Sequence, residues 1–483
     1  MADPLHGLAD VESTLELALG ETRRYLATLA DAPVQSGDVE QQLKAIDGSL
    51  PDTGAGSLAA VRELAELGHA AATRSSGPRF FHFVTGGTTP AALAADWLAS
   101  SFDQNPGLWE GSPLAARLET VSLAWLRELF GLPAEWSGVL TTGATMANFV
   151  GLGAARRWWG ERHGADVDEN GLAGLPAVPV FSSGYVHSSA LKALAMLGIG
   201  RAGVRIFARD EVGRLDLHGL EAALRELDGA PAIVIANAGD VNTGDFDPID
   251  AMADLAEAHG AWLHVDGAFG LFARVTPEAA ELAAGVERAD SVISDGHKWL
   301  NVPYDCGFAF VRDPSLLLNA FSLAAAYLPP GDETRPNYGF MGPESSRRAR
   351  ALTTWATLKA YGRDGYRAMV ERHLQLAKRL AAAVEGEPDL ELLADAKLNI
   401  VCFRFRPPDV PEVELDELNR RLGAMVLDDA RVYFGTTVYG GKVAFRPAIV
   451  NWRTTEHDVD LIVQVLRELG PRCRSPRAPR ARA

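Results

Sequence analysis

A lysine stands between a histidine and a tryptophan in the stretch SVISDGHKWLNVPYD, residues 291–305. The apolar run at 291–293 predicts a short strand that ends just before this group. Lys298 is therefore either a solvated residue of a surface turn or an amine held in a partly dry site. Because a desolvated lysine loses its proton readily, the second alternative makes Lys298 a nucleophile that forms a Schiff base with a carbonyl.

Two more polar residues follow predicted strands. Asp266 ends the strand in AWLHVDG (261–267), and His187 follows the strand in VPVFSS (178–183). An unpaired buried carboxylate is costly, so Asp266 caps a helix, forms a salt bridge or pairs with a protonated pyridine nitrogen. His187 is either a structural residue at the mouth of a helix or a flat ring that stacks on a flat cofactor. Its neighbour Ser188 is a helix cap or a ligand.

The turn TTGATMAN, residues 141–148, precedes a strongly predicted helix. Gly143, Ala144 and Thr145 at a helix N-terminus would expose backbone N–H groups to an anion, and the helix dipole adds to the attraction. The alternative is an ordinary N-cap. The chain has neither GxGxxG after its first strand nor GxxxxGK[ST], which disfavours a dinucleotide-binding oxidoreductase and a P-loop protein.

In chain order, these features form a phosphate cradle, a stacking imidazole, a carboxylate at a strand end and a lysine after the next strand. Pyridoxal phosphate needs this set, because its phosphate, its ring faces, its ring nitrogen and its aldehyde each require a different partner. Each feature alone is weak. The ordered set predicts a pyridoxal-phosphate enzyme.

The elements that must position these residues have the rhythm of an α/β protein. Short runs that are apolar throughout alternate with helical segments, which predicts a largely parallel sheet covered on both faces. Ligands of such sheets bind beyond the carboxyl ends of the strands. The predicted strands lie at 178–183, 204–208, 232–239, 261–267, 291–296 and 307–313.

The chain divides into four parts by pattern. Residues 1–78 are expected to form a helical dimerisation segment, with helices in 11–31 and 58–71, and residues 79–344 the large cofactor-binding domain. Residues 345–470 predict a small α+β domain that begins with two long helices, 349–362 and 366–385. The basic, Pro-containing residues 471–483 predict a disordered tail.

Composition narrows the partners. The chain has 483 residues, 47% of them hydrophobic, a net charge of −17 and a pI of about 5.2, which argues against nucleic acid and anionic membranes. Cys306, Cys402 and Cys473 are widely spaced, so neither a disulfide framework nor a metal site is predicted and a cytoplasmic location fits. No signal peptide or membrane span is expected.

Several longer blocks resemble one family. The blocks HVDGAFG, SDGHKWLNVPYDCG and YVHSSALKALAMLG, with RFFHFVTGGTTPAALAADWLAS and SPLAARLETVSLAWLRELFGLP nearer the N-terminus, resemble the pyridoxal-phosphate-dependent group II amino acid decarboxylases. The resemblance runs from about residue 40 to 470. It implies a fold type I enzyme with a mostly parallel seven-stranded sheet. It also implies an obligate homodimer with its site at the subunit interface.

The resemblance assigns roles residue by residue. Lys298 would hold the cofactor aldehyde, Asp266 the ring nitrogen, and His187 and Ala268 the two ring faces. The phosphate would be held near His297 by the residues Gly143, Ala144 and Thr145. Two departures stand out. Gly143 replaces a frequent serine, and AGDVNTGDFD replaces a threonine-rich run, so Asn242 or Thr243 would take over a contact near the ring oxygen.

A candidate proton donor lies in ETRPNYGFMGPESSRRAR, residues 333–350. The family carries a tyrosine on a mobile loop at this spacing. The resemblance therefore implies that Tyr338, or a water or His187 assisted by it, protonates the α-carbon after carbon dioxide leaves. The Gly, Pro and polar content fits a mobile lid. A tyrosine here favours simple decarboxylation over aldehyde formation. The alternative is that Tyr338 only packs at an interface.

The sequence determines the substrate less closely than it determines the cofactor. Phe81, His82, Phe83 and Trp109 fall where the family lines its side-chain pocket, which favours an aromatic L-amino acid, unless these residues only build the N-terminal layer. Arg446 in KVAFRPAIVNW could bind a carboxylate, so an acidic substrate stays open.

The expected activity is decarboxylation of an L-amino acid to its amine. Aldehyde synthesis, transamination or carbon–carbon lysis on the same scaffold are the alternatives. A non-enzymatic descendant is a further alternative, but the presence of Lys298, Asp266 and His187 argues against it.

Overall fold

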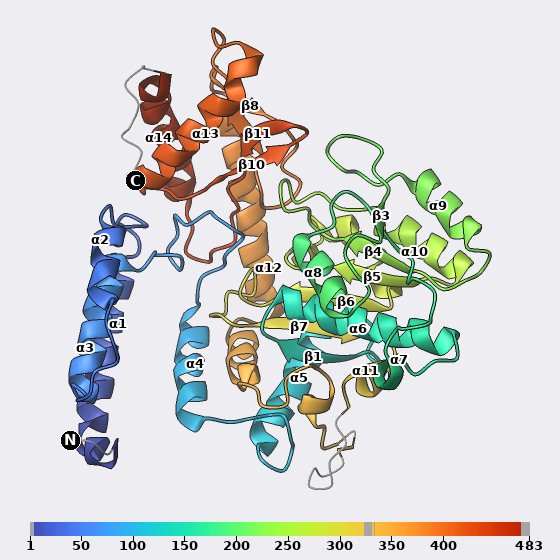
Figure 1. Cartoon of the computed structure of the whole chain (residues 1–483). Helices are drawn as coiled ribbons and strands as arrows, with labels where there is room; N and C mark the ends of the chain where they lie inside the picture. Colours follow the sequence, from blue (N-terminus) through green and yellow to red (C-terminus); the bar gives the residue numbers. More distant parts are fainter. Residues whose placement is uncertain (1–3, 323–330, 333, 475–483) are drawn as a thin grey trace.

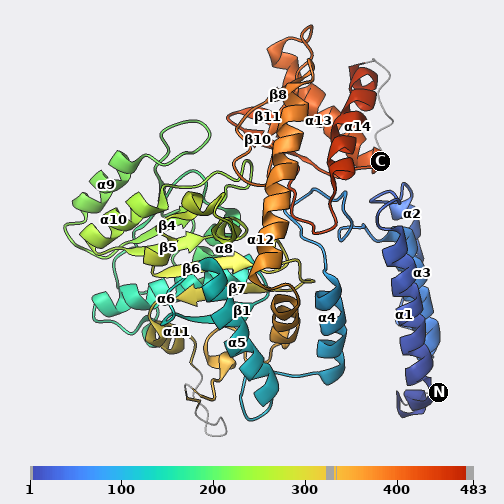
Figure 2. The ribbon, with the colours of Figure 1, turned by 180° about the vertical axis from the view of Figure 1, so that it is seen from behind.

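The computed structural model describes residues 4–322, 331–332 and 334–474. Three parts follow one another along the chain (Figure 1): a helical N-terminal arm, a large domain built on a central sheet, and a small domain at the C-terminal end. The arm stands beside the other two parts in both views (Figure 2), and the long helix α12 connects the large domain to the small one.

The N-terminal arm is a pair of packed helices with short helical pieces around them, as the apolar spacing predicts. No residue of its helices α1, α2 or α3 is buried, so this part has no core of its own. Its elements are η1 Pro4–Asp10, α1 Val11–Thr28, α2 Val39–Leu43, η2 Lys44–Ile46 and α3 Ser57–Ala71.

The large domain is built on a seven-stranded sheet in the order β1-β7-β6-β5-β4-β2-β3. Five consecutive strands of this order, from β6 to β3, run parallel to one another, and β7 runs antiparallel to both of its neighbours, β1 and β6. The mostly parallel seven-stranded α/β sheet is therefore confirmed. The strands are β1 Ser137–Thr141, β2 Val180–Ser182, β3 Val204–Ile206, β4 Ile233–Asn237, β5 Trp262–Asp266, β6 Ser291–Asp295 and β7 Gly307–Val311.

All six predicted runs contain a strand of this sheet, and β1 is the one strand that the apolar runs did not mark. Every residue of β4, β5, β6 and β7 is buried, because helices cover the sheet on both faces. The helices of this domain are α4 Pro90–Phe102, α5 Pro113–Phe130, α6 Ala144–Arg162, α7 Val167–Asn170, α8 Ser188–Met196, α9 Leu217–Glu226, α10 Ile249–His259 and α11 Pro314–Phe321. The short 3-10 segments are η3 Gly270–Val275, η4 Ala280–Ala283, η5 Val286–Arg288 and η6 Tyr338–Phe340.

The segment α12 Arg350–Glu385 consists of two helices that meet at a kink, in agreement with the two helices predicted at 349–362 and 366–385. Gly362 has φ 58° and ψ −172°, a non-helical conformation that only glycine adopts readily, and it separates the two helical parts of α12 at the kink. The first half of α12 packs against α4 and α5, and the second half contributes to the small domain.

The small domain is α+β, as predicted, with an antiparallel sheet in the order β10-β11-β9-β8. The last helix ends at Arg474, so residues 471–474 are helical rather than part of the predicted tail, and residues 475–483 lie outside the described residues. Its elements are β8 Leu390–Leu392, β9 Phe403–Phe405, α13 Glu412–Asp429, β10 Thr436–Tyr439, β11 Lys442–Phe445 and α14 Glu456–Arg474.

Two predicted absences can be compared with the described part of the chain. No helix there has the length and apolar character to cross a membrane, and no cluster of three potential metal ligands occurs there. Cys306, Cys402 and Cys473 are all buried free thiols.

Candidate active site

Four polar residues meet at one edge of the large sheet. His187, Asp240, Asp266 and Lys298 lie at or just beyond the carboxyl ends of β2, β4, β5 and β6, which are adjacent parallel strands. Because parallel strands end at the same edge, residues more than a hundred positions apart in sequence lie together. This edge is the candidate active site.

The Lys298 amine faces an aromatic ring. Its Nζ lies 5.7 Å from the centroid of Phe269, and no carboxylate of the described residues forms an ion pair with it. A Cβ on Gly86 would overlap the carbonyl oxygen of Lys298, so the segment that carries Gly86 approaches the lysine backbone closely. Lys298 is half-buried in a turn, which favours an amine held in a partly dry site over a fully solvated lysine.

The Asp266 carboxylate is buried and has only neutral partners. It accepts hydrogen bonds from the Asn148 side-chain amide at 2.9 Å and from the Ala268 backbone N–H at 3.2 Å. No cationic side chain of the described residues forms an ion pair with it, and it does not cap a helix. A buried carboxylate without a cationic partner is a suitable place for a protonated ring nitrogen.

His187 has exposed surface, its ring is partly desolvated by its surroundings, and one ring nitrogen is fixed. His187 is the N-cap of α8, where its Nδ1 accepts the Ser189 backbone N–H at 3.2 Å and lies 2.7 Å from the Ser189 hydroxyl. Desolvation lowers the pKa of His187, so the ring is neutral near pH 7. Ser188 is exposed at the first position of α8 and makes no side-chain hydrogen bond among the described residues.

A carboxylate that sequence reasoning overlooked lies at the N-terminus of α6. The Ala144 N–H donates to Asp295 Oδ2 at 3.1 Å, and Asp295 Oδ1 lies 3.0 Å from the His297 Nδ1 atom. Gly143 is the N-cap with φ 149°, and a Cβ there would lie 3.0 Å from the His297 ring. Thr145 follows in the first helical turn, half-buried. The position of Asp295 at a predicted strand end, two residues before His297, was the available signal.

Arg446 brings a positive charge to the same region. It is 8% exposed, and its Nε and Nη2 atoms have no hydrogen-bond partner among the described residues. Burial lowers the pKa of Arg446 to about 10, against the opposing effect of Asp240. Burial, together with the charge of Arg446, lowers the pKa of His82 to about 4. An unpaired buried guanidinium is suited to bind a carboxylate.

The predicted pocket aromatics are separated by the structure. Phe81 is buried in the core of the small domain, so its ring faces away from the site. Phe83 is 66% exposed, has φ 60° and lies with its ring centroid 3.6 Å from that of His82. Trp109 is half-buried, and its backbone N–H donates to Asn337 at 2.9 Å.

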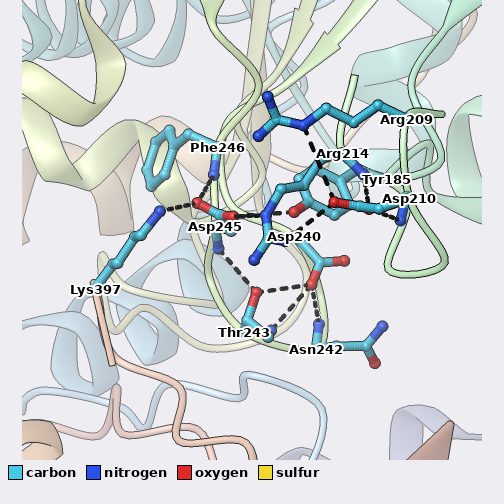
Figure 3. A network of polar contacts seen from close by, with 11 residues as sticks. Tyr185, Arg209, Asp210, Arg214, Asp240, Asn242, Thr243, Asp245, Phe246 and Lys397 are labelled. Atoms are coloured by element: carbon cyan, nitrogen blue, oxygen red, sulfur yellow. Dashed lines mark hydrogen bonds and ion pairs between the residues drawn. The ribbon is translucent and has the colours of Figure 1, made fainter. Parts of the chain in front are cut away.

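Asn242 belongs to a polar network between the two domains (Figure 3). Its backbone N–H donates to Asp240 at 2.9 Å, and its side-chain oxygen accepts from the Thr437 hydroxyl of β10 at 2.7 Å. Asp245 in the same loop pairs with Lys397 of the small domain at 2.8 Å. The loop after β4 is thus tied to the small domain.

Tyr338 lies apart from Lys298 within this chain. It starts the 3-10 segment η6, is 4% exposed, and donates its hydroxyl hydrogen bond to Thr120 at 3.0 Å. No contact among the described residues joins it to the lysine. The predicted lid spans 333–350, of which Glu333 lies outside the described residues, and Arg347 forms a buried ion pair with Glu119 at 2.8 Å.

Sequence reasoning also missed two buried residues near Asp266. Asn148 closes the quoted turn TTGATMAN and has no exposed surface, and His264 lies two residues before Asp266 with no exposed surface. The signal for Asn148 was a polar amide on a helix face of small residues, Ala144, Ala147 and Gly151.

The fold and these residues define the class of the protein. A half-buried lysine, a buried carboxylate without a cationic partner and an exposed imidazole at the carboxyl edge of a parallel sheet fit pyridoxal phosphate. The sequence model described as "Pyridoxal-dependent decarboxylase conserved domain" matches residues 40–406. The chain belongs to this family and is a pyridoxal-phosphate-dependent amino acid decarboxylase.

Individual relatives are similar over most of the chain. An L-2,4-diaminobutyrate decarboxylase of Rhizobium meliloti (strain 1021) is 32% identical over 94% of this chain and 90% of its own length. An aromatic-L-amino-acid decarboxylase of Bacillus atrophaeus is 30% identical over 82% of each chain. The solved structure of Oryza sativa TDC with PLP and tryptamine superposes with a TM-score of 0.89 at 28% identity, covering 98% of this chain and 100% of that one.

Proposed function

We propose that this enzyme decarboxylates an aromatic L-amino acid to the corresponding amine and carbon dioxide. The observation that carries the proposal is Phe83, an aromatic side chain that is 66% exposed in a left-handed backbone conformation. It lies three residues before Gly86, whose backbone N–H donates to the His297 carbonyl beside Lys298. An exposed, conformationally unfavourable aromatic residue on a segment that contacts the backbone at Lys298 is suited to contact a substrate. The aromatic-L-amino-acid relative supports the same substrate class.

The residues at the sheet edge have separate proposed roles toward the cofactor. Pyridoxal phosphate, when bound, supplies a protonated ring that accepts the electrons of the bond to the substrate carboxylate. Lys298 would hold its aldehyde through the side-chain amine. Asp266 keeps the proton on the ring nitrogen, because a buried carboxylate stabilises a cation next to it. His187 and Ala268 cover the two faces of the ring.

The anionic end of the cofactor belongs at the start of α6. Gly143, Ala144 and Thr145 would bind the phosphate through backbone N–H groups and the Thr145 hydroxyl, with His297 beside them. The Ala144 N–H donates to Asp295 in this structure, so its contact with the phosphate would require that this hydrogen bond be exchanged. Ser188 and Asn242 remain proposed polar contacts. Asn242 engages Thr437 in this structure, so a contact with the cofactor would use its backbone or a rearranged side chain.

An acidic substrate is the second candidate, and Arg446 is the observation in its favour. Its unpaired guanidinium can bind either the α-carboxylate of any amino acid or the side-chain carboxylate of an acidic one. The two uses differ in outcome. A role for Arg446 on the side chain predicts that only acidic substrates depend on it.

Tyr338 is proposed as the proton donor to the α-carbon. Burial raises the pKa of Tyr338 well above its ordinary value, so its hydroxyl keeps its proton at neutral pH. The contact with Thr120 holds this hydroxyl away from Lys298 and has to open before the transfer.

We propose a homodimer with the active site at its interface. The arm carries exposed apolar side chains and has no core, as expected for helices that pack on a second copy. We also place the enzyme in the cytoplasm, since its three cysteines are free thiols, which a reducing compartment maintains.

The test is product analysis on the cofactor-loaded enzyme. Aromatic, acidic and aliphatic L-amino acids are offered in turn, and carbon dioxide and product mass are recorded together. Carbon dioxide and amine from the aromatic members alone, abolished by Lys298→Ala, is the expected result. Release from acidic members would support the second candidate, and an absence of carbon dioxide from every member would contradict the proposed activity.

Two substitutions separate the candidates. Phe83→Leu is expected to lower kcat/KM for an aromatic substrate by about tenfold, since a hydrophobic pocket discriminates by roughly this factor. Arg446→Gln is expected to slow all substrates if it binds the α-carboxylate. A loss confined to acidic substrates, with Phe83→Leu unchanged, would contradict the aromatic assignment.

A further inference from the structure

A buried amide connects two residues of the candidate site. Asn148 lies in the second turn of α6 with no exposed surface. Its side-chain nitrogen is 2.9 Å from Asp266 Oδ2 and 3.2 Å from the Ser189 hydroxyl. Its side-chain oxygen is 2.8 Å from His264 Nε2. Both N–H hydrogens and the oxygen of this amide therefore form hydrogen bonds.

The carboxylate fixes which way the amide points. An ionised carboxylate only accepts, so the Asn148 nitrogen faces Asp266 and the oxygen faces His264. His264 must then carry its proton on Nε2. Its Nδ1 accepts from the Ser291 hydroxyl at 2.7 Å. The Ser291 oxygen in turn accepts the Trp262 indole N–H at 3.0 Å, and an indole can only donate.

The same amide holds the Ser189 hydroxyl that contacts His187. Its second hydrogen goes to the Ser189 oxygen, whose own hydrogen is then free for His187 Nδ1 at 2.7 Å. The Ser189 backbone N–H also points at Nδ1. His187 therefore carries its proton on Nε2, the nitrogen that faces away from α8.

The surroundings preserve this arrangement. His264 is fully buried, and desolvation lowers its pKa to about 4, so it is neutral near pH 7 and its tautomer is defined. A Cβ on Gly151 of α6 would lie 2.8 Å from the His264 ring. A glycine inside a helix is less stable than an alanine, and at this position it makes room for the imidazole.

We propose that Asn148 is a positioning residue that couples Asp266 to His187, with His264, Ser291 and Trp262 fixing its direction. One amide thereby orients the carboxylate that faces the ring nitrogen and the Ser189 hydroxyl that holds the imidazole covering the ring. The inference rests on the proposed roles of Asp266 and His187 toward pyridoxal phosphate. Networks of this kind act on the group that they orient rather than on the substrate.

The experiment measures cofactor binding without substrate. The dissociation constant of pyridoxal phosphate and the pH midpoint of the bound cofactor's absorbance change are compared between the wild type and Asn148→Leu, which keeps the volume and removes the hydrogen bonds. We expect the dissociation constant to rise at least tenfold and the midpoint to move by about one pH unit, since both ring contacts lose their orientation.

Asn148→Asp provides a second variant if the leucine variant does not fold. It places a carboxylate beside Asp266, and two carboxylates at this distance share a proton, so the midpoint is expected to move in this variant too. Thr357→Val is the matched control, because it removes a buried hydroxyl hydrogen bond in α12, far from this network in sequence and on a different helix. The control should change neither quantity.

The outcomes separate this inference from the proposed function. A wild type that binds pyridoxal phosphate through Lys298, with a folded Asn148 variant that binds it with the same affinity and midpoint, overturns the inference alone. A wild type that shows no Lys298-dependent absorbance overturns both. A change in Thr357→Val as large as in Asn148→Leu would reduce Asn148 to a general contribution to packing and also overturns the inference.

Discussion

At the residue scale, the buried carboxylates differ in their hydrogen-bonding and charged partners. Asp266 has only neutral donors, whereas Asp295 is beside His297 and the N-terminus of α6. Asp247, in the loop after β4, accepts from the Asn237 backbone and side chain and from Ser183, and its other oxygen has no partner among the described residues. The partner set, rather than burial alone, decides which carboxylate is available to a ligand.

The Asp247 carboxyl predicts a pH dependence of stability. Burial raises its pKa to about 6 from the ordinary value of 3.8. The folded state therefore binds the proton more tightly than the unfolded state, and this group's stabilising contribution is lost as pH rises from about 4 to about 6. Asp247→Asn is expected to remove this loss, on the order of 2 to 3 kcal/mol.

Urea unfolding of Asp247→Asn and the wild type checks the prediction. It is measured at about pH 4.5, near the start of this window, and at about pH 7.5, above its end. The variant should gain stability relative to the wild type at the higher pH. If the variant and the wild type differed in unfolding free energy by the same amount at both pH values, the Asp247 carboxyl would not titrate in this window.

The Tyr338 hydroxyl predicts a change of product. Tyr338→Phe keeps the buried ring and removes the proposed proton donor, so carbon dioxide release should continue while amine yield falls by at least tenfold. Aldehyde is expected in its place, with dioxygen as the oxidant. Mass spectrometry of the products with measured dioxygen uptake checks this.

Thr120→Val is the matched control for Tyr338. It removes the same hydrogen bond and leaves the tyrosine hydroxyl in place, so amine should remain the product. An unchanged amine yield in Tyr338→Phe would contradict the protonation role and support the alternative that this tyrosine only packs.

At the scale of elements, α6 does the most to build the site. Its N-terminus offers backbone N–H groups beside His297, and its second turn carries Asn148 to Asp266. The helix packs on β6 and β7 and on α8, which begins at His187. A single rigid helix therefore sets the distance between the phosphate end and the ring end of the proposed cofactor site.

The kink of α12 predicts a position where only glycine is tolerated. Gly362→Ala would place a side chain in a backbone region that non-glycine residues rarely adopt, which costs about 1 to 3 kcal/mol. Nothing lies within 4 Å of the added Cβ, so the effect would come from the backbone alone. A lower urea midpoint is the expected result.

Gly386→Ala serves as the comparison for Gly362. Gly386 follows the end of the same helix with φ −73° and ψ −14°, where an added Cβ meets only ordinary contacts at 3.5 Å. It should be neutral or slightly stabilising. If the two substitutions changed the urea midpoint equally, the backbone conformation at the kink would not require glycine.

At the scale of the whole molecule, the polar network of Figure 3 connects the two domains beside the site. Lys397 and Thr437 of the small domain contact Asp245 and Asn242 of the loop after β4. Arg446, on the other hand, follows β11 and reaches the region of His187 from the small domain. The candidate site is thus formed by both domains.

The N-terminal arm predicts self-association. Leu15 of α1 is 61% exposed and Leu64 of α3 is 68% exposed on helices without buried residues. Replacing both by Glu should shift a dimer toward monomers at micromolar concentration, because charges would be buried in the interface. Sedimentation velocity measures this.

Val413→Glu controls for the added charge, since Val413 is 90% exposed on α13 of the small domain. It should leave the dimer unchanged. A wild type that sediments as a monomer, or a double variant that remains dimeric, would contradict the proposed role of the arm.

The sequence by itself determined the class of fold and the chemistry of the site. Period and composition marked six strands of the sheet and the small α+β domain, because buried parallel strands must be apolar throughout. The order of a cradle, an imidazole, a carboxylate and a lysine pointed to pyridoxal phosphate, and the family comparison confirmed that prediction. Residue types and their spacing along the chain indicate the chemistry of a motif, so a motif can be recognised from the sequence alone.

Only the tertiary structure decided which residues share surroundings. Phe81 turned into the core of the small domain while Phe83 stayed exposed, although two positions separate them. Asn148 reached Asp266 across 118 positions, a contact that no local pattern contains. Burial, pairing and proton positions depend on neighbours brought together by folding, and these neighbours lie far apart along the chain.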